Sequence, residues 1–224
     1  MSARVLVSGA QGRMGSFACA LLERAGGFEV AARTVRGDNL GEVARECGAE
    51  LGLDFTVAGL GFDHGLALLE AGLRPVIGTS GVSSEEVREL DRYARKRDLG
   101  GLVVANFSLG IACLRQAVRA AARTFAEGEI IELHHDTKRD APSATARELR
   151  DLMGAEGMEE VAIHSVRLPG LYAHHEVLLG GPGETLSLRH DTLGPEAFGP
   201  GILAGLGYAL VATGVDCGLE HALE

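Results

Sequence analysis

Hydrophobic and polar positions divide the chain into two regions that differ in period. Between Arg4 and Ala105, short apolar runs alternate with segments in which apolar residues recur at helical spacing, and these predict strands and helices respectively. Strands that alternate with helices are typical of a parallel sheet with right-handed crossovers. The predicted strands are residues 4–8, 28–33, 53–57, 75–77 and 103–105, and the predicted helices are residues 17–25, 65–71 and 85–95.

After Ser108 the spacing of the apolar residues along the chain changes. One long helix is predicted over residues 109–126, and the following segments alternate between apolar and polar residues. That alternation predicts a mixed or antiparallel sheet covered by helices. Its strands are predicted at residues 130–135, 161–168, 175–179 and 185–190. The pattern indicates a first domain of residues 1–106 and a second of residues 107–195, with a final helix in residues 196–224 that packs back on the first.

Composition narrows the class of protein. With 46% apolar and 23% charged residues the chain is typical of a globular protein, and its net charge of −10 argues against nucleic acid as a partner. The four cysteines are far apart and form no C-x-x-C pair, and no signal peptide is evident, so we expect reduced thiols and a cytoplasmic location. Residues 198–215 are uncharged, but Pro200 and several glycines favour a buried helix over a membrane span.

A glycine-rich turn follows the first predicted strand and opens the first helix. It reads Gly9-Ala10-Gln11-Gly12-Arg13-Met14-Gly15. Glycines let backbone N–H groups approach a pyrophosphate at the positive end of a helix dipole. Glycines also serve any sharp strand-to-helix turn, but the position in the first unit of an α/β domain favours dinucleotide binding.

The end of the second strand helps to select the cofactor. An acidic residue there holds the ribose of NAD, whereas arginine accommodates the 2′-phosphate of NADP. This chain has Arg33-Thr34-Val35-Arg36, and no acidic residue before Asp38. The pattern favours the phosphorylated cofactor, with two solvated loop arginines as the alternative. Arg13 adds a further cation in the glycine turn.

Histidine and lysine gather at a predicted strand-to-helix connection. His134, His135 and Lys138 end the strand, and Ser143 or Asp140 is placed to cap a helix with Pro142 in its first turn. Such a helix start binds anions, and a histidine beside a lysine suits proton transfer to a reduced substrate. The alternative is an exposed polar connection. Adjacent histidines on a strand face opposite sides, so no metal site is predicted.

Motifs across most of the chain share the order of a known family. The most specific is Glu132-x-His134-His135-x-x-Lys138-x-Asp140-Ala141-Pro142-Ser143-x-Thr145-Ala146. Others are the glycine turn, Asp54-Phe55-Thr56, Val76-Ile77-Gly78-Thr79-Ser80-Gly81, Asn106-Phe107-Ser108-x-Gly110, Ser165-Val166-Arg167 and Gly183-Glu184. In these motifs the chain resembles the dihydrodipicolinate reductase family.

This resemblance implies an α/β fold. It consists of a Rossmann-like parallel-sheet dinucleotide domain and an α+β domain, with a mixed sheet, for substrate binding and tetramer formation. It also implies an NADPH- or NADH-dependent reductase of a cyclic dicarboxylate, which produces tetrahydrodipicolinate in the diaminopimelate route to lysine, and a homotetramer.

The resemblance also assigns roles to residues. His134 and Lys138 are implied as catalytic, and His135, Ala144 and Thr145 as substrate-binding. The implied cofactor residues are Gly9, Gln11, Gly12, Arg13, Met14, Gly15, Arg36, Gly78, Thr79, Ser80, Ala105, Asn106 and Phe107.

The chain departs from the family pattern at several positions. Ala144 replaces the signature glycine, Val35 stands at the acidic position after the second strand, and Pro195 replaces an arginine. The chain is also shorter than is usual for the family. These departures keep two alternatives open: a catalytically silent dinucleotide-binding sensor and a related reductase of another small carboxylate.

Overall fold

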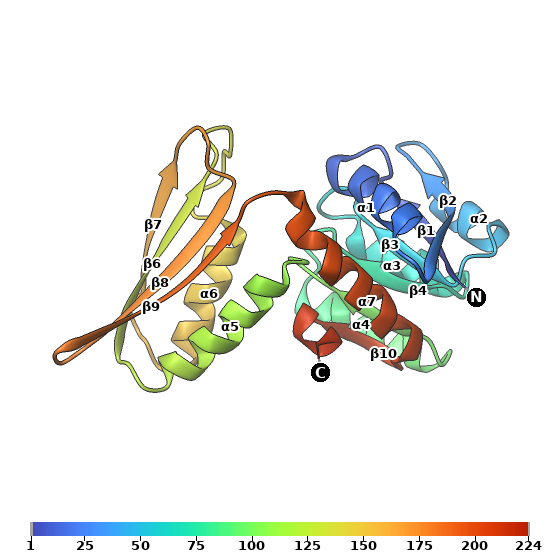
Figure 1. The fold of residues 1–224 in the computed structure, drawn as a ribbon. Helices are drawn as coiled ribbons and strands as arrows, with labels where there is room; N and C mark the ends of the chain where they lie inside the picture. Colours follow the sequence, from blue (N-terminus) through green and yellow to red (C-terminus); the bar gives the residue numbers. More distant parts are fainter. Residues whose placement is uncertain (1, 224) are drawn as a thin grey trace. The chain divides into compact units, whose positions relative to one another are not determined.

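A computed structural model describes residues 2–223 (Figure 1). These residues form two compact units. The first unit comprises residues 2–107 and 198–223, and the second unit comprises residues 108–197. None of the helices in the described part of the chain combines the length and apolar character needed to cross a membrane.

The first unit is built on a parallel sheet of six strands within residues 2–223, in the order β10-β5-β4-β3-β1-β2. This arrangement confirms the predicted α/β fold. The strands are β1 (Ala3–Ser8), β2 (Phe28–Thr34), β3 (Leu51–Asp54), β4 (Arg74–Ile77), β5 (Gly100–Val103) and β10 (Gly214–Cys217). Val5, Leu6 and Val7 are completely buried, as expected for a strand that is covered on both faces.

Helices cover both faces of this sheet (Figure 1). They are α1 (Arg13–Arg24), α2 (Leu40–Glu46), α3 (Gly61–Glu70), α4 (Ser84–Arg95) and α7 (Gly199–Val211). Neighbouring residues of β4 show the two layers, because Ile77 packs with α3 and α4 while Val76 lies beside Gly205 of α7. Serine at a helix start explains the sharp beginning of α4, where Ser83 and Glu86 form a capping box.

The C-terminal segment differs from the sequence prediction of one helix over residues 196–224. The helix α7 ends at Val211, and Gly214, with φ of +95°, starts strand β10 at the sheet edge. A left-handed φ suits glycine and interrupts a helix. The helix α7 lies close to the segment that follows β5, since a Cβ on Gly201 would lie 1.9 Å from the Phe107 carbonyl oxygen.

Two strands of the first unit begin and end earlier than predicted. The buried glycines in β3 and β5 concealed them, because glycine carries no strand signal. These glycines are required by packing. A Cβ on Gly52 would lie 2.4 Å from the Leu68 side chain, and one on Gly100 would lie 2.4 Å from the Ala212 carbonyl oxygen. The short helix α2 was also absent from the prediction.

The second unit contains a mixed sheet of four strands within the described residues, in the order β7-β6-β8-β9. Strands β6 and β7 are parallel and the other pairs are antiparallel, which confirms the predicted mixed sheet. The strands are β6 (Glu127–His134), β7 (Ala162–Arg167), β8 (Ala173–Gly181) and β9 (Glu184–Thr192).

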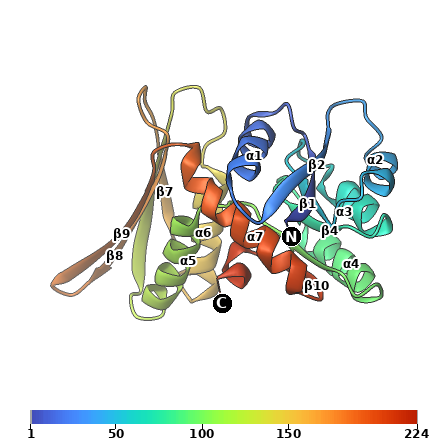
Figure 2. The same ribbon diagram turned by 45° about the vertical axis from the view of Figure 1, so that its right-hand side comes forward.

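Two helices cover one face of this sheet (Figures 1 and 2). They are α5 (Leu109–Ala122) and α6 (Ala144–Ala155). Ile130, Val177 and Leu179 are buried against them, while Ile131 and Leu178 lie on the other face. Two short 3₁₀ turns, η1 (Pro195–Phe198) and η2 (Leu219–Ala222), complete the described elements.

Candidate active site

The glycine turn between β1 and α1 is closely packed. Gly9 has φ of +75°, and a Cβ there would lie 2.5 Å from the Phe55 carbonyl oxygen. A Cβ on Gly15 would lie 2.1 Å from the carbonyl oxygen of Gly9. No side chain caps the start of α1 at Gly12, so the backbone N–H groups of the first helical turn can face an anion. The turn therefore fits a pyrophosphate.

A cavity of about 650 Å³ opens beside this turn. It is large enough to take much of a dinucleotide. The predicted cofactor residues that line it are Gly9, Gln11, Gly12, Arg13, Met14 and Arg36. Asp38 also lines it and accepts a hydrogen bond from the Val35 backbone N–H at 2.8 Å. The cavity thus offers both a cation and an anion near the end of β2.

The other predicted cofactor residues lie elsewhere in the first unit. Gly78, Thr79 and Ser80 follow β4, and residues 105–107 follow β5. None of these residues, and not Gly15, is among those that line the cavity in the described chain. Gly78 sits between two aromatic rings, since a Cβ there would lie 2.3 Å from Phe55 and 2.8 Å from Phe107.

A buried carboxylate at the end of β3 forms a polar cluster that was not predicted from the sequence. Asp54 is fully buried and accepts hydrogen bonds from the hydroxyl groups of Thr56 and Thr79 and from Nδ1 of His64, the last at 2.8 Å. That hydrogen bond from His64 to Asp54 raises the pKa of His64 against the opposing effect of burial, and the charges of Asp54 and Asp63 add to it.

This cluster reaches the cavity through His64 and Thr56, which both line it. His64 lies in the first turn of α3 and lines the cavity with Arg13 and Arg36, and its raised pKa favours the imidazolium form there. The motif Asp54-Phe55-Thr56 marked this position, but the strand was predicted over residues 53–57, so Asp54 was not expected at its end. In the structure Asp54 ends β3, and the carboxyl edge of a parallel sheet brings together strand ends and the following helix starts.

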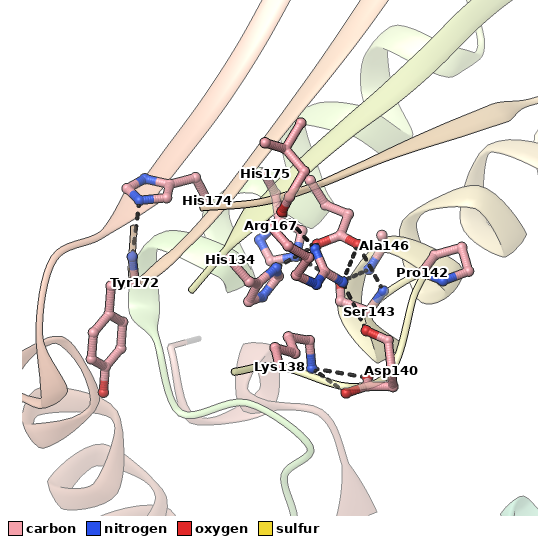
Figure 3. Close-up of polar contacts among 12 residues, drawn as sticks. His134, Lys138, Asp140, Pro142, Ser143, Ala146, Arg167, Tyr172, His174 and His175 are labelled. Carbon is pink, nitrogen blue, oxygen red and sulfur yellow. Dashed lines mark hydrogen bonds and ion pairs between the residues drawn. The ribbon is translucent and has the colours of Figure 1, made fainter. Parts of the chain in front are cut away.

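The predicted catalytic histidine lies at the end of β6 in the second unit. His134 is almost completely buried, and its Nδ1 is hydrogen-bonded to Glu132, two residues earlier on the same face of the strand. Its ring also makes an edge contact with the ring of His175, with centroids 5.3 Å apart. Figure 3 shows His134 and His175 beside Arg167.

Burial dominates the titration of His134. Desolvation lowers the pKa of this imidazole, and the charges of Lys138 and Arg167 lower it further. Glu132 acts in the opposite direction but does not outweigh these effects. His134 is therefore more acidic than an ordinary histidine.

The predicted catalytic lysine lies on the loop after β6. Lys138 Nζ contacts both carboxylate oxygens of Asp140, at 2.8 and 2.9 Å, and this contact is the main reason that the pKa of Asp140 is lowered. His135 Nδ1 lies 2.6 Å from the Thr137 hydroxyl. The loop therefore holds Lys138 through a carboxylate on the same loop.

The loop leads into α6, where Ser143 is the capping residue. Its hydroxyl accepts a hydrogen bond from the Ala146 N–H at 3.1 Å, so Asp140 is not the cap and Pro142 precedes the helix. Ala144 is exposed and Thr145 is half-buried in the first turn. The methyl group of Ala144 therefore adds bulk at an accessible helix start.

Two further histidines hold the starts of both helices. His175 Nε2 lies 3.1 Å from the Ser143 hydroxyl, and His190 Nε2 lies 3.2 Å from the hydroxyl of Ser108, which caps α5. Burial, and then the charge of His134, lowers the pKa of His175 to about 4. The pKa of His190 is also lowered by burial, so both histidines favour the neutral form beside the capping serines.

His174 has other hydrogen-bond partners, although its charge also lowers the pKa values of His175 and His190. Its Nδ1 lies 2.6 Å from Asp191, and its Nε2 accepts a hydrogen bond from the Tyr172 N–H (Figure 3).

A separate hollow of about 890 Å³ in the second unit is lined by Glu127, Glu129, Glu159 and Glu160, and by none of the predicted site residues.

Two family profiles together match most of the chain. The family profile described as "Dihydrodipicolinate reductase, N-terminus" matches residues 3–107, and the profile "Dihydrodipicolinate reductase, C-terminus" matches residues 110–218. The 4-hydroxy-tetrahydrodipicolinate reductase of Legionella pneumophila (strain Lens) is 39% identical over 243 residues, which cover 100% of both chains. That of Lactococcus lactis subsp. cremoris (strain MG1363) is 38% identical and covers 99% of this chain and 97% of its own.

Solved structures give the same result. Dipicolinate-bound dihydrodipicolinate reductase from Paenisporosarcina sp. TG-14 is 29% identical, with a TM-score of 0.90, covering 98% of this chain and 99% of the other. Scyllo-inositol dehydrogenase from Lactobacillus casei, at 10% identity and a TM-score of 0.69 over 100% of this chain and 93% of its own, shares the fold alone. The chain therefore belongs to the dihydrodipicolinate reductase family, whose members are NADH- or NADPH-dependent α/β oxidoreductases.

Proposed function

We propose that this chain reduces 4-hydroxy-tetrahydrodipicolinate to tetrahydrodipicolinate, in the diaminopimelate route to lysine. The reaction takes a hydride from NADPH or NADH and a proton, and the 4-hydroxyl group leaves as water. The observation that carries this proposal is the retention of His134 and Lys138 at one end of the second unit's sheet, with Lys138 near enough to lower the pKa of His134. The full-length relatives share this activity by name. A silent sensor would have no need of both groups.

His134 and Lys138 are proposed to supply the proton of the reduction. Because Nδ1 of His134 is hydrogen-bonded to Glu132, Nε2 is the ring nitrogen that exchanges a proton with substrate. The lysine ammonium stabilises the negative charge that develops on the substrate or donates the proton itself.

The start of α6 is proposed to bind a substrate carboxylate. Ala144 and Thr145 present backbone N–H groups in its first turn, where the helix dipole favours an anion. His135, on the loop before the helix, is proposed to contact the same substrate. The relative of known structure, which is described as dipicolinate-bound, supports a dicarboxylate ligand.

The first unit is proposed to hold the nicotinamide cofactor, which supplies the hydride when bound. The glycine turn from Gly9 to Gly15 would bind the pyrophosphate, and Arg36 would contact the ribose or its 2′-phosphate. Residues 78–80 and residues 105–107 would lie toward the nicotinamide. The cavity that contains both Arg36 and Asp38 is consistent with use of either NADPH or NADH.

A homotetramer is proposed as the assembly. The sheet face opposite α5 and α6 carries the half-buried side chains Ile131, Leu133 and Leu178 together with charged residues. Such a face gains stability when it is covered by another copy. Sedimentation of the purified protein tests this, with a mass of four chains expected.

The four cysteines, all within the described residues, are free thiols, consistent with the proposed cytoplasmic location.

A coupled assay tests the proposed reaction. Dihydrodipicolinate synthase generates the unstable substrate in place, and the oxidation of NADPH or NADH is followed by absorbance. Turnover that depends on the synthase is the expected result. Tight cofactor binding without turnover would contradict the proposal and favour the silent sensor or another carboxylate substrate.

A further inference from the structure

Glu132 is a buried charge that the proposed proton transfer does not itself use. Its side chain is fully buried at the end of β6. Moving a carboxylate out of water is costly unless it is paired and hydrogen-bonded. Burial acts to raise the pKa of Glu132, but hydrogen bonds from Arg167 and Ser165 and the charge of His134 outweigh burial and lower it to about 2. Glu132 is therefore ionised throughout the neutral range.

Both oxygens of this carboxylate are fully engaged. Oε1 accepts from Arg167 Nη2 at 2.7 Å and from the Ser143 N–H at 3.3 Å, and Oε2 accepts from Arg167 Nη1 at 3.0 Å and from His134 Nδ1. An ionised carboxylate can only accept hydrogen bonds, so the proton of neutral His134 is held on Nδ1.

Arg167 extends this arrangement to the lysine loop. Its Nη2 also donates to the backbone carbonyl oxygen of Asp140 at 2.7 Å, and the carboxylate of Asp140 holds Lys138. Figure 3 shows the side chains of His134, Arg167, Asp140 and Lys138 in this order around the loop. A continuous set of contacts therefore joins the two proposed proton-transfer groups.

We propose that Glu132 and Arg167 are positioning residues for the reduction, Glu132 by fixing the tautomer and orientation of His134 and Arg167 by tying that carboxylate to the loop of Lys138. This inference rests on the proposed function. Neither residue is assigned to substrate or cofactor. Each acts through the group that it holds, as buried partners of catalytic histidines do.

The charges around His134 give the proposal a directional consequence. The groups that face it are Glu132 on its own strand, Arg167 on β7, His175 on β8 and Lys138 on the loop. Removal of the carboxylate takes away the attraction that favours the imidazolium ion, whereas removal of the guanidinium takes away a repulsion. The two neutral substitutions must therefore shift the titration of His134 in opposite directions.

Glu132→Gln and Arg167→Gln, each made in the intact 224-residue chain, test this. Imidazole titrations are followed by NMR with labelled histidine, and His134→Gln identifies the resonance. We expect Glu132→Gln to lower the pKa of His134 and Arg167→Gln to raise it. We also expect Glu132→Gln to lower kcat by about 10²-fold, with little change in the KM for cofactor. Arg167→Lys keeps the charge, so the pKa of His134 should stay near its original value while kcat falls.

Glu129→Gln is the matched control. Glu129 lies on the same strand and also pairs with a histidine, His164, at 2.7 Å, but both side chains are exposed. It should leave kcat and the titration of His134 unchanged. Shifts in the same direction for Glu132→Gln and Arg167→Gln, or none, would overturn the positioning roles even if the wild-type protein turns over. Opposite shifts in a protein without reductase activity would support the placement and contradict the proposed function.

Discussion

Each unit contains a histidine bound to a fully buried carboxylate, yet the two histidines are shifted in opposite directions. In the first unit the hydrogen bond to Asp54 raises the pKa of His64. In the second unit burial lowers the pKa of His134 in spite of its contact with Glu132. A histidine–carboxylate pair is therefore compatible with a raised histidine pKa in one unit and a lowered one in the other.

The neighbours of each carboxylate explain the difference. Asp54 is otherwise surrounded by neutral hydroxyl donors, so its hydrogen bond with His64 and its charge both favour the imidazolium form of His64. Glu132 has already been neutralised by the bidentate contact with Arg167, and Lys138 adds a second positive charge near His134. The surroundings thus favour the imidazolium form of His64 beside Asp54, where an anionic cofactor is proposed to bind. They favour the neutral form of His134 beside Glu132, where a proton is proposed to be transferred.

The largest expected effect comes from Lys138→Ala. We expect kcat to fall by about 10²–10⁴-fold, because the proposed role of this ammonium belongs to the transition state. The dissociation constant of NADPH should change little. The loss of a nearby positive charge should also raise the pKa of His134. The difference between the pKa values of His64 and His134 should therefore become smaller. Steady-state kinetics and cofactor titration measure these effects, and undiminished kcat would remove Lys138 from the proposed mechanism.

Acid should destabilise the second unit through His175. Its pKa of about 4 lies below the ordinary value of 6.5, so the unfolded chain binds more protons between these values. This contribution to stability is present above pH 6.5 and is lost as the pH falls toward 4, by up to about 3 kcal/mol. Urea unfolding at several pH values measures it. His175→Gln should flatten the dependence, whereas replacement of the exposed His164 should not.

His64 should have the opposite dependence in the first unit. Because its pKa is raised in the folded protein, its contribution to stability is present below pH 6.5 and is lost as the pH rises through the raised value. His64→Gln should remove this loss in the same unfolding series. A stability difference between His64→Gln and wild type that does not vary with pH would contradict a raised pKa of His64 in the folded protein.

Arg36→Ala should act on the first unit alone. We expect it to weaken NADPH binding more than NADH binding, by about 1–3 kcal/mol, because one charge-assisted contact to the 2′-phosphate is lost. Calorimetric titration with each cofactor measures the difference. An unchanged preference would remove Arg36 from the cofactor site.

The smallest effect is expected from Ala144→Gly. This substitution restores the residue of the family signature at the exposed start of α6. The KM for the dicarboxylate should fall by about threefold or less, equivalent to about 0.7 kcal/mol or less. Kinetics at limiting substrate measure it, and a rise in KM would show that the methyl group improves the fit.

Much of this arrangement could be predicted from sequence because its signals are local. Apolar runs predicted the parallel sheet, and spacing placed Gly9 and Gly12 beside the first helix. The strand β10 escaped prediction because four residues that follow a helix gain strand character only from pairing with β5. Long-range side-chain contacts were also beyond a local pattern, since Arg167 meets Glu132 and His64 meets Asp54 only after folding.

The titration of His64 and His134 in one intact sample tests the central comparison most directly. Histidine-labelled protein is followed by NMR across the neutral range, with His64→Gln and His134→Gln to identify the two resonances. We expect His64 to titrate above pH 6.5 and His134 below it. Titration of both histidines on the same side of pH 6.5 would contradict the claim that their surroundings shift the two pKa values in opposite directions.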